Sequence, residues 1–265
     1  MYHSITFEKA YAQLSVSKNT WDDWHLVPSS RPVVNPPSVK TKTVDIPGGN
    51  GLIDLTESLS GYPTYNNRTG SIEFIVVNDF NWQNPDHEEW YKTYSDVMNF
   101  VHGKSLRMYL EDDKEYYYEG RFSVDSWKSD KNNSKISIKY DVSPFKRYFS
   151  TTTNEDWLWD PFNFQTGVIY SSIFKNIPIT TTAEIHRFSS KDIGDAPFSG
   201  IFTVSTTSQI RFLSGSSWSN WVTIDANTPT GISSNKSNYG DYVSMEVKTN
   251  SGTGTLSIDF KPGRF

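Results

Sequence analysis

The segment from Lys40 to Val77 reads KTKTVDIPGGNGLIDLTESLSGYPTYNNRTGSIEFIVV. PGGNG at its centre is a turn signal, because glycine reaches the positive φ angles of a tight reversal without steric cost. On either side, TKTVDI and LIDLTE alternate apolar with polar residues, as strands do when one face meets solvent. The segment therefore predicts a long β-hairpin over residues 40–56. SIEFIVV, at its end, predicts a strand that is buried on both faces.

One helix is predicted after this strand. Asn84 suits the N-cap and Pro85 the first helical position, and apolar residues recur at helical spacing from Trp90 to Val101. Gly103 is a suitable stop signal. Short alternating segments separated by turns then predict antiparallel strands up to the neighbourhood of residue 145.

The character of the chain changes near residue 150. The later part carries fewer charges and more Ser, Thr, Gly and Asn, and strand-like runs such as GIFTVST, SQIRFLSG and TGTLSIDFK recur. This spacing is typical of a small antiparallel β-sandwich. We therefore predict a mainly β protein with two domains, residues 1–150 and 151–265.

The composition of the 265 residues excludes several classes of protein. Aromatic residues make up 15% of the chain, which is too many for a disordered protein. The net charge is −5 and no basic run occurs, which argues against specific nucleic-acid binding. There is no cysteine to form a disulfide. No signal peptide and no apolar run long enough to span a membrane is found, so we expect synthesis in a cytoplasm and no membrane partner.

The stretch TWDDWHLVPSSRPVVNPP, residues 20–37, contains the most enzyme-like cluster. Asp22 and Asp23 could share protons, with His25 as a shuttle. In extended backbone, however, adjacent side chains point to opposite faces, so the two carboxylates would not converge on one substrate atom. We interpret the pair as turn formers.

The other residues of this stretch indicate a structural role, in which the chain is anchored to the core. Trp21 and Trp24 are interpreted as side chains inserted into a core. The recurring prolines predict an extended arm over residues 26–38, since proline suits neither a helix interior nor a central strand.

No other motif supports catalysis. The five histidines show no metal-ligand spacing, and no nucleophile elbow occurs. We therefore predict no enzyme activity, no catalytic residue, no metal and no cofactor. Trp218, Trp221 and Tyr239 are candidates for stacking against sugars, although aromatic residues of a β-sandwich are more often core or interface residues.

Four motifs together resemble the N-terminal region of distal tail (Dit) proteins from long-tailed phages and prophages of Gram-positive bacteria. They are W-x-x-W-H-L-x-P-x-S-R-P, K-T-x-x-V-D-I-P-G-G-x-G, D-L-T-E-S-L-x-G and the YYYEGRFSV-x-x-W module, and they span roughly residues 15–145. Beyond these residues the resemblance rests on size, β pattern and the final SIDFKPGRF strand.

The resemblance implies a structural hub of the phage tail tip, or baseplate, located in the virion. Its N-terminal half would have the tail-tube fold, a β-sandwich with one flanking α-helix and a long hairpin. Its C-terminal half would be a galectin-like or jelly-roll sandwich. Six copies would form a ring between the tail-tube protein and a tail-associated lysin, fibre or receptor-binding protein, and DNA would pass through the channel without specific binding.

On this interpretation, a set of residues is assigned to the ring or partner interface: Trp21, Trp24, Arg31, Val44, Ile46, Leu52 and Leu55. Arg31 is expected to contact an acidic partner. The alternative function is a carbohydrate-binding, lectin-like adhesin that uses the C-terminal sandwich for host attachment. The two functions are compatible, because a hub can carry an adhesive domain.

Overall fold

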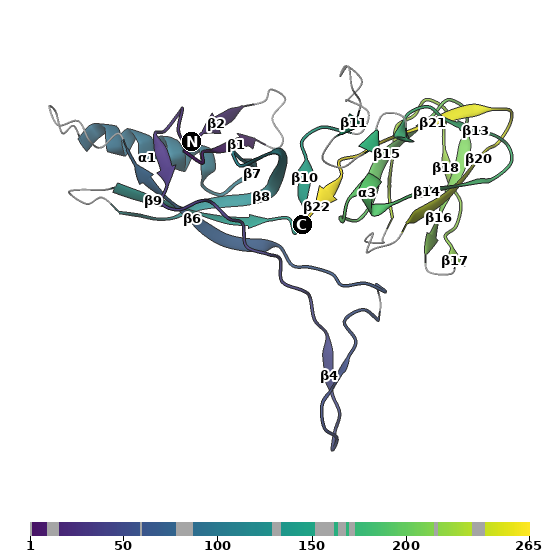
Figure 1. Cartoon of the computed structure of the whole chain (residues 1–265), viewed down its shortest axis with the longest axis horizontal. Helices are drawn as coiled ribbons and strands as arrows, with labels where there is room; N and C mark the ends of the chain where they lie inside the picture. Colours follow the sequence, from purple (N-terminus) through teal and green to yellow (C-terminus); the bar gives the residue numbers. More distant parts are fainter. Residues whose placement is uncertain are drawn as a thin grey trace. The chain divides into compact units, whose positions relative to one another are not determined.

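The computed structural model describes residues 2–9, 16–58, 60–77, 87–128, 134–151, 162–163, 168–169, 173–214, 217–234 and 242–265. For residues 87–90, 162–163, 168–169 and 214 it describes the backbone alone. The chain divides into two compact units: Met1–Val39 with Tyr65–Lys146, and Lys40–Thr64 with Arg147–Phe265. The fold is mainly β, as predicted (Figure 1).

The first unit is built on an antiparallel sheet in the order β2-β1-β7-β8-β9-β6-β3. Its strands are β1 (Ile5–Lys9), β2 (Ser17–Asn19), β3 (Leu26–Pro28), β6 (Arg68–Val76), β7 (Lys104–Leu110), β8 (Asp113–Lys128) and β9 (Ser134–Val142). The predicted arm thus begins as strand β3. Its Pro28 is tolerated because β3 is an edge strand, where a missing N–H breaks no ladder.

Helix α1 (His87–Val101) packs against β7 and β8 on one face of this sheet (Figure 1). Val97 and Val101 are fully buried there. The helix ends before Gly103, which has a φ of 70°, as the stop signal predicted. The predicted cap residues Asn84 and Pro85 lie outside the described residues.

Alternate residues of β1, β6, β7 and β9 contribute to the core of the first unit. In β6, Ile72, Phe74 and Val76 are buried, whereas Ile75 is half-buried and Val77, just after the strand, is 42% exposed. The prediction that SIEFIVV is buried on both faces was therefore wrong. Ile72, Phe74 and Val76 share the face that joins the core cluster, and Ile75 points to the opposite face of the sheet, which is only partly covered.

The second unit contains an antiparallel β-sandwich among its described residues. One sheet is four-stranded, in the order β13-β21-β15-β19; the other is five-stranded, in the order β14-β20-β16-β17, with β18 also paired to β16. The strands are β13 (Ile177–Ile179), β14 (Glu184–Phe188), β15 (Ser199–Val204), β16 (Ser208–Ser214), β17 (Ser217–Trp218), β18 (Val222–Ile224), β19 (Thr230–Ser233), β20 (Val243–Thr249) and β21 (Gly254–Asp259).

A cluster of phenylalanines fills the space between these two sheets: Phe174, Phe188, Phe198, Phe202, Phe212 and Phe260. Their rings meet at centroid distances of 4.8 to 6.5 Å, most of them tilted or edge to face. Such arrangements favour contact between the positive edge of one ring and the negative face of the next.

The remaining elements are short: β10 (Lys146–Tyr148), β11 (Phe162–Asn163), β12 (Val168–Ile169), α3 (Ser190–Ile193) and β22 (Gly263–Arg264). β10 pairs with β22, and β11 with β12. The predicted hairpin consists of β4 (Thr43–Asp45) and β5 (Leu52–Asp54), which pair in antiparallel register around PGGNG. Gly48 and Gly51 have φ values of 74° and 90°, as the turn requires.

Candidate assembly surface

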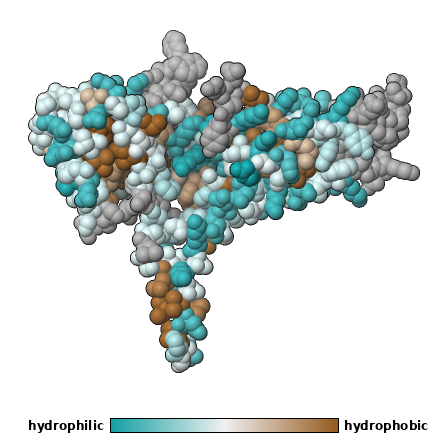
Figure 2. All heavy atoms as spheres, turned by 180° about the vertical axis from the view of Figure 1, so that it is seen from behind, coloured by the Kyte–Doolittle hydropathy of each residue, from teal (hydrophilic) through white to brown (hydrophobic). Residues whose placement is uncertain are grey.

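The hairpin over residues 40–58 exposes apolar side chains on both of its faces. Val44 and Ile53 oppose each other across the strands and share one face, whereas Leu52 opposes Asp45 and lies on the other. Leu52 is 62% exposed, and Ile46, Leu55 and the opposed pair are exposed as well. Figure 2 shows these hydrophobic residues gathered along the hairpin. The expectation of one solvent-facing side was wrong, because neither face is covered.

Ile53 was not among the predicted interface residues. The signal was present in the sequence, since Leu52 and Ile53 are adjacent apolar residues and adjacent strand residues point to opposite faces. The alternation in LIDL is therefore broken at a position where the strand carries apolar side chains on both sides.

Local hydrogen bonds hold the hairpin together. The N–H of Gly49 donates to the carbonyl of Ile46, and the N–H of Leu55 to the carbonyl of Lys42. Farther along, the N–H of Lys40 donates to the carbonyl of Thr64. An isolated two-stranded hairpin is at best marginally stable in water. Exposed apolar side chains on both faces of such a hairpin are typical of a surface that a partner covers.

The residues on either side of the hairpin pair with each other in the first unit. Val39 and Tyr65 form a bridge, and the N–H of Asn66 donates to the carbonyl of Ser38. The ring of Tyr65 meets that of Phe145 edge to face, with 6.0 Å between the centroids. The chain segments that flank residues 40–64 are therefore paired with each other within the first unit.

Residues 20–24 form a turn, as predicted. The side-chain oxygen of Asn19 accepts hydrogen bonds from the backbone N–H groups of Trp21 and Asp22. Asp23 turns the other way and accepts from the N–H of Asn19, at 2.7 Å, and from the ammonium of Lys18, at 2.9 Å. Burial acts to raise the pKa of Asp23, but these hydrogen bonds outweigh it and the pKa is lowered.

The two carboxylates do not converge. Asp22 lines a polar cavity of about 300 Å³ together with Ser4, Thr6, Asn19 and Tyr109, while Asp23 is engaged with Lys18 on its other side. A shared-proton pair requires carboxylates in direct contact. The arrangement therefore provides no acid pair.

The tryptophans on either side of the turn have different environments. Trp24 is 2% exposed and packs near Phe7 and Phe100 in the core. Trp21 is partly exposed and stacks on Tyr2, with centroids 3.9 Å apart. Trp24 therefore anchors the turn and offers no surface to a partner, whereas Trp21 retains an accessible edge.

Arg31 lies on the arm and contacts an acid of its own chain. Its Nε donates to Asp112 at 3.0 Å, and His3 lies 2.9 Å from the same carboxylate. The hydrogen bonds from His3 and from Arg31 lower the pKa of Asp112. The side chain of Arg31 is 69% exposed, so this contact leaves most of it accessible to a partner.

The candidate sugar-stacking residues lie in the second unit. Trp218 ends β17 and Trp221 directly precedes β18, and both are partly exposed. The guanidinium of Arg211 lies over both rings, 5.1 Å from the centroid of Trp218 and 4.4 Å from that of Trp221. Tyr239, the third candidate, lies outside the described residues.

Among the described residues, no three His, Asp or Glu side chains gather in a way that could hold a metal ion. Within the same ranges, no helix has both the length and the apolar character needed to cross a membrane.

Comparison with known proteins shows a likeness in fold. No protein-family model matches the chain, and no curated protein matches it. The chain is similar to the solved structure of SPP1 Dit (gp 19.1), with a TM-score of 0.55 and 12% identity over 97% of this chain and 98% of that chain. The chain has a Dit-like fold. SPP1 Dit is described as a paradigm of the hub adsorption apparatus in phages that infect Gram-positive bacteria.

The Dit-like fold extends over both units and the hairpin, since the match covers both chains nearly from end to end. At this identity the likeness concerns the fold, and a fold by itself does not specify a function.

Proposed function

We propose that this protein is a structural hub of a phage tail tip and not an enzyme. Residues 1–150, with the hairpin, form the ring-forming domain, and residues 151–265 form a peripheral, galectin-like sandwich. Six copies close into a ring that joins the tail-tube protein to a tail-associated or receptor-binding protein. The observation that carries this proposal is the end-to-end likeness to a protein described as a hub.

The hairpin supports a role in assembly. Its apolar residues are exposed on both faces, so a copy or a neighbouring tail protein that packs against them removes them from water. Each Å² of apolar surface buried in this way is worth about 25 cal/mol. A head-to-tail interface of this kind forms a closed ring when its rotation closes, and a filament otherwise.

The charge of the chain suits a channel for DNA. With a net charge of −5 for each copy, a ring has no overall attraction for a polyanion, so DNA can pass without being retained. The protein would then be made in the host cytoplasm and end in the virion at the tail tip.

The mass of the purified particle tests the proposal. We expect a species of six chains, each of 30.3 kDa, by native mass spectrometry, either for the protein alone or after mixing with the tail-tube protein of the same phage. Negative-stain images of that species should show rings. A chain that stays monomeric at all concentrations and with both neighbouring tail proteins would refute the hub.

A further inference from the structure

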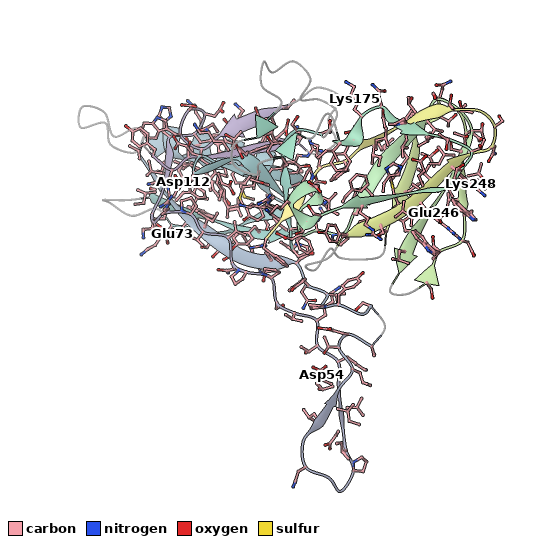
Figure 3. The ribbon with its side chains drawn as sticks, turned by 45° about the vertical axis from the view of Figure 1, so that its right-hand side comes forward. Asp54, Glu73, Asp112, Lys175, Glu246 and Lys248 are labelled. Carbon is pink, nitrogen blue, oxygen red and sulfur yellow. The ribbon has the colours of Figure 1, made fainter. Side chains whose placement is uncertain are left out.

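The outer face of the five-stranded sheet carries a cluster of charged residues. Along β20, Met245 and Val247 are buried in the core, so Glu246 and Lys248 point to the opposite side (Figure 3). Arg211 of β16 lies directly opposite Glu246 in the register, and Gln209 lies opposite Lys248. Residues opposite each other share a face, so these four side chains lie together on the outside of the sandwich.

Arg211 is held in place from three sides. Its Nε and Nη2 both contact Oε2 of Glu246. Its guanidinium also lies over the rings of Trp218 and Trp221. These contacts remove rotamer freedom before any ligand arrives, which lowers the entropic cost of binding. Nη1 is the guanidinium nitrogen that the pair with Glu246 leaves unused.

Two further cations extend the cluster. The ammonium of Lys248 lies 4.6 Å from the ring centroid of Trp221. Arg187 of β14 is exposed and lies opposite Ser244 of β20, on the same face. We name the set Arg187, Arg211, Glu246 and Lys248 the cationic face. Three cations against one carboxylate make it locally positive, in a chain whose net charge is −5.

We propose that the cationic face binds an anionic carbohydrate. Nη1 of Arg211 and Nζ of Lys248 are donors for a charged carboxylate or phosphate substituent. Oε1 of Glu246 is an acceptor beside them, which suits the hydroxyl groups of a sugar ring. The indole rings of Trp218 and Trp221 hold these cations in position.

The cations that lie over the indole rings change the recognition mode expected for Trp218 and Trp221. Arg211 covers a face of each ring, so the rings act mainly by orienting the cations instead of stacking freely on a sugar. Packing of the rings alone would also explain their contact with Arg211. It would not explain the third cation, Arg187, on the same face. The proposal does not depend on the hub assignment. The site lies within the second unit of a single copy of the chain, so it is present with or without assembly.

The test uses the full chain on a panel of paired saccharides that differ only in charge. Each neutral sugar is printed beside its uronate and its phosphate-bearing counterpart, and positive spots are followed by titration calorimetry. We expect binding to one or both anionic forms, weaker binding to the neutral form, and an affinity that falls as salt rises. The uronate and phosphate arms distinguish the two sources of charge.

Charge reversal locates the site. Lys248→Glu and Arg187→Glu should each weaken binding roughly tenfold or more, because an attractive charge is replaced by a repulsive one. Lys104→Glu, at an exposed position of the first unit, is the matched control and should leave the affinity unchanged. Melting temperatures show whether each variant is folded. Because Arg187 is exposed, we expect Arg187→Glu to fold. Equal binding to neutral and anionic forms, no saccharide binding at millimolar concentration, or full affinity in both reversal variants would each overturn the proposal.

Discussion

Arg68 donates from Nη1 to the backbone carbonyl of Asn35, 3.2 Å away, and so ties the first residue of β6 to the proline-rich arm. Its Nε donates to the carbonyl of Pro144 at 2.7 Å, and its guanidinium lies over the ring of Tyr118. The side chain is 5% exposed, and burial lowers its pKa. Among the described residues no carboxylate pairs with it, so backbone carbonyls and a ring stabilise the buried charge.

Replacing Arg68 tests whether its hydrogen bonds stabilise the contact of β6 with the segments at Asn35 and Pro144. We expect Arg68→Met to lower the free energy of unfolding by about 2–4 kcal/mol, because two carbonyls lose their donor inside the protein. Denaturant unfolding followed by tryptophan fluorescence measures the change. Arg31→Met is the control, since Arg31 is largely exposed and should cost little. An equal loss of unfolding free energy in Arg68→Met and Arg31→Met would contradict this stabilising role of Arg68.

Gly70 lies where the arm meets the sheet. A Cβ at this position would clash with Oη of Tyr140 and would come within 2.7 Å of Nδ2 of Asn35. The N–H of Asn35 donates to the same Tyr140 oxygen, so this clash would push the arm away from the sheet. Gly70→Ala should cost about 1–3 kcal/mol. Gly231→Ala, where no atom lies within 4 Å of the added carbon, should be close to neutral in the same unfolding assay.

The two tryptophans of the turn should differ in their contribution to stability. Trp24→Ala should cost about 3–5 kcal/mol, since it empties a large volume in the core. Trp21→Ala should cost about 1 kcal/mol, mostly from the lost stack on Tyr2. Thermal unfolding by circular dichroism compares them. A loss for Trp21→Ala as large as that for Trp24→Ala would show that both rings are structural anchors.

Asp23 and Asp22 should respond differently to neutralisation. Asp23→Asn should cost about 0.5–1 kcal/mol at neutral pH, because the pair with Lys18 is lost, and Asp22→Asn should cost less. The folded-state pKa of Asp23 lies below its unfolded value, so its contribution is present above about pH 4 and disappears as the pH falls further. Melting temperatures between pH 2 and 7 should show the gap between wild type and Asp23→Asn closing in acid. A gap that is constant with pH would contradict this assignment.

The hairpin should matter for assembly and not for folding. Leu52→Asp places a charge on an exposed apolar position and should change the free energy of unfolding by less than about 0.5 kcal/mol. It should abolish the six-chain species, because a buried unpaired charge opposes association. Thr41→Asp, an exposed polar position of the same hairpin, is the control for added charge. Native mass spectrometry measures the six-chain species in both variants. Normal assembly of Leu52→Asp would show that the interface lies elsewhere.

Local patterns in the sequence were sufficient for the elements of this fold. The glycines of PGGNG require positive φ angles, alternation marks the strands, and Gly103 ends the helix, and each of these signals depends on neighbouring residues only. Asp22 and Asp23 are separated, as predicted, but the reason is the turn in which they lie, and not the alternation of an extended strand. Alternation was insufficient for SIEFIVV and for the two faces of the hairpin, where burial depends on what packs above the strand.

The contacts that carry the proposals join residues far apart in the chain. Arg68 meets Asn35 and Pro144, and Arg211 meets Glu246 and Trp221, through the register of strands and the packing of side chains. A single sequence contains no local signal for such contacts, because they depend on strand register and on complementary shape and charge between side chains that are not neighbours in the chain. The sequence by itself therefore determined the β class, the hairpin turn and the direction of each strand residue. Only the tertiary structure decided which arginine is buried, which tryptophan is covered and which apolar face stays open, since these depend on long-range packing.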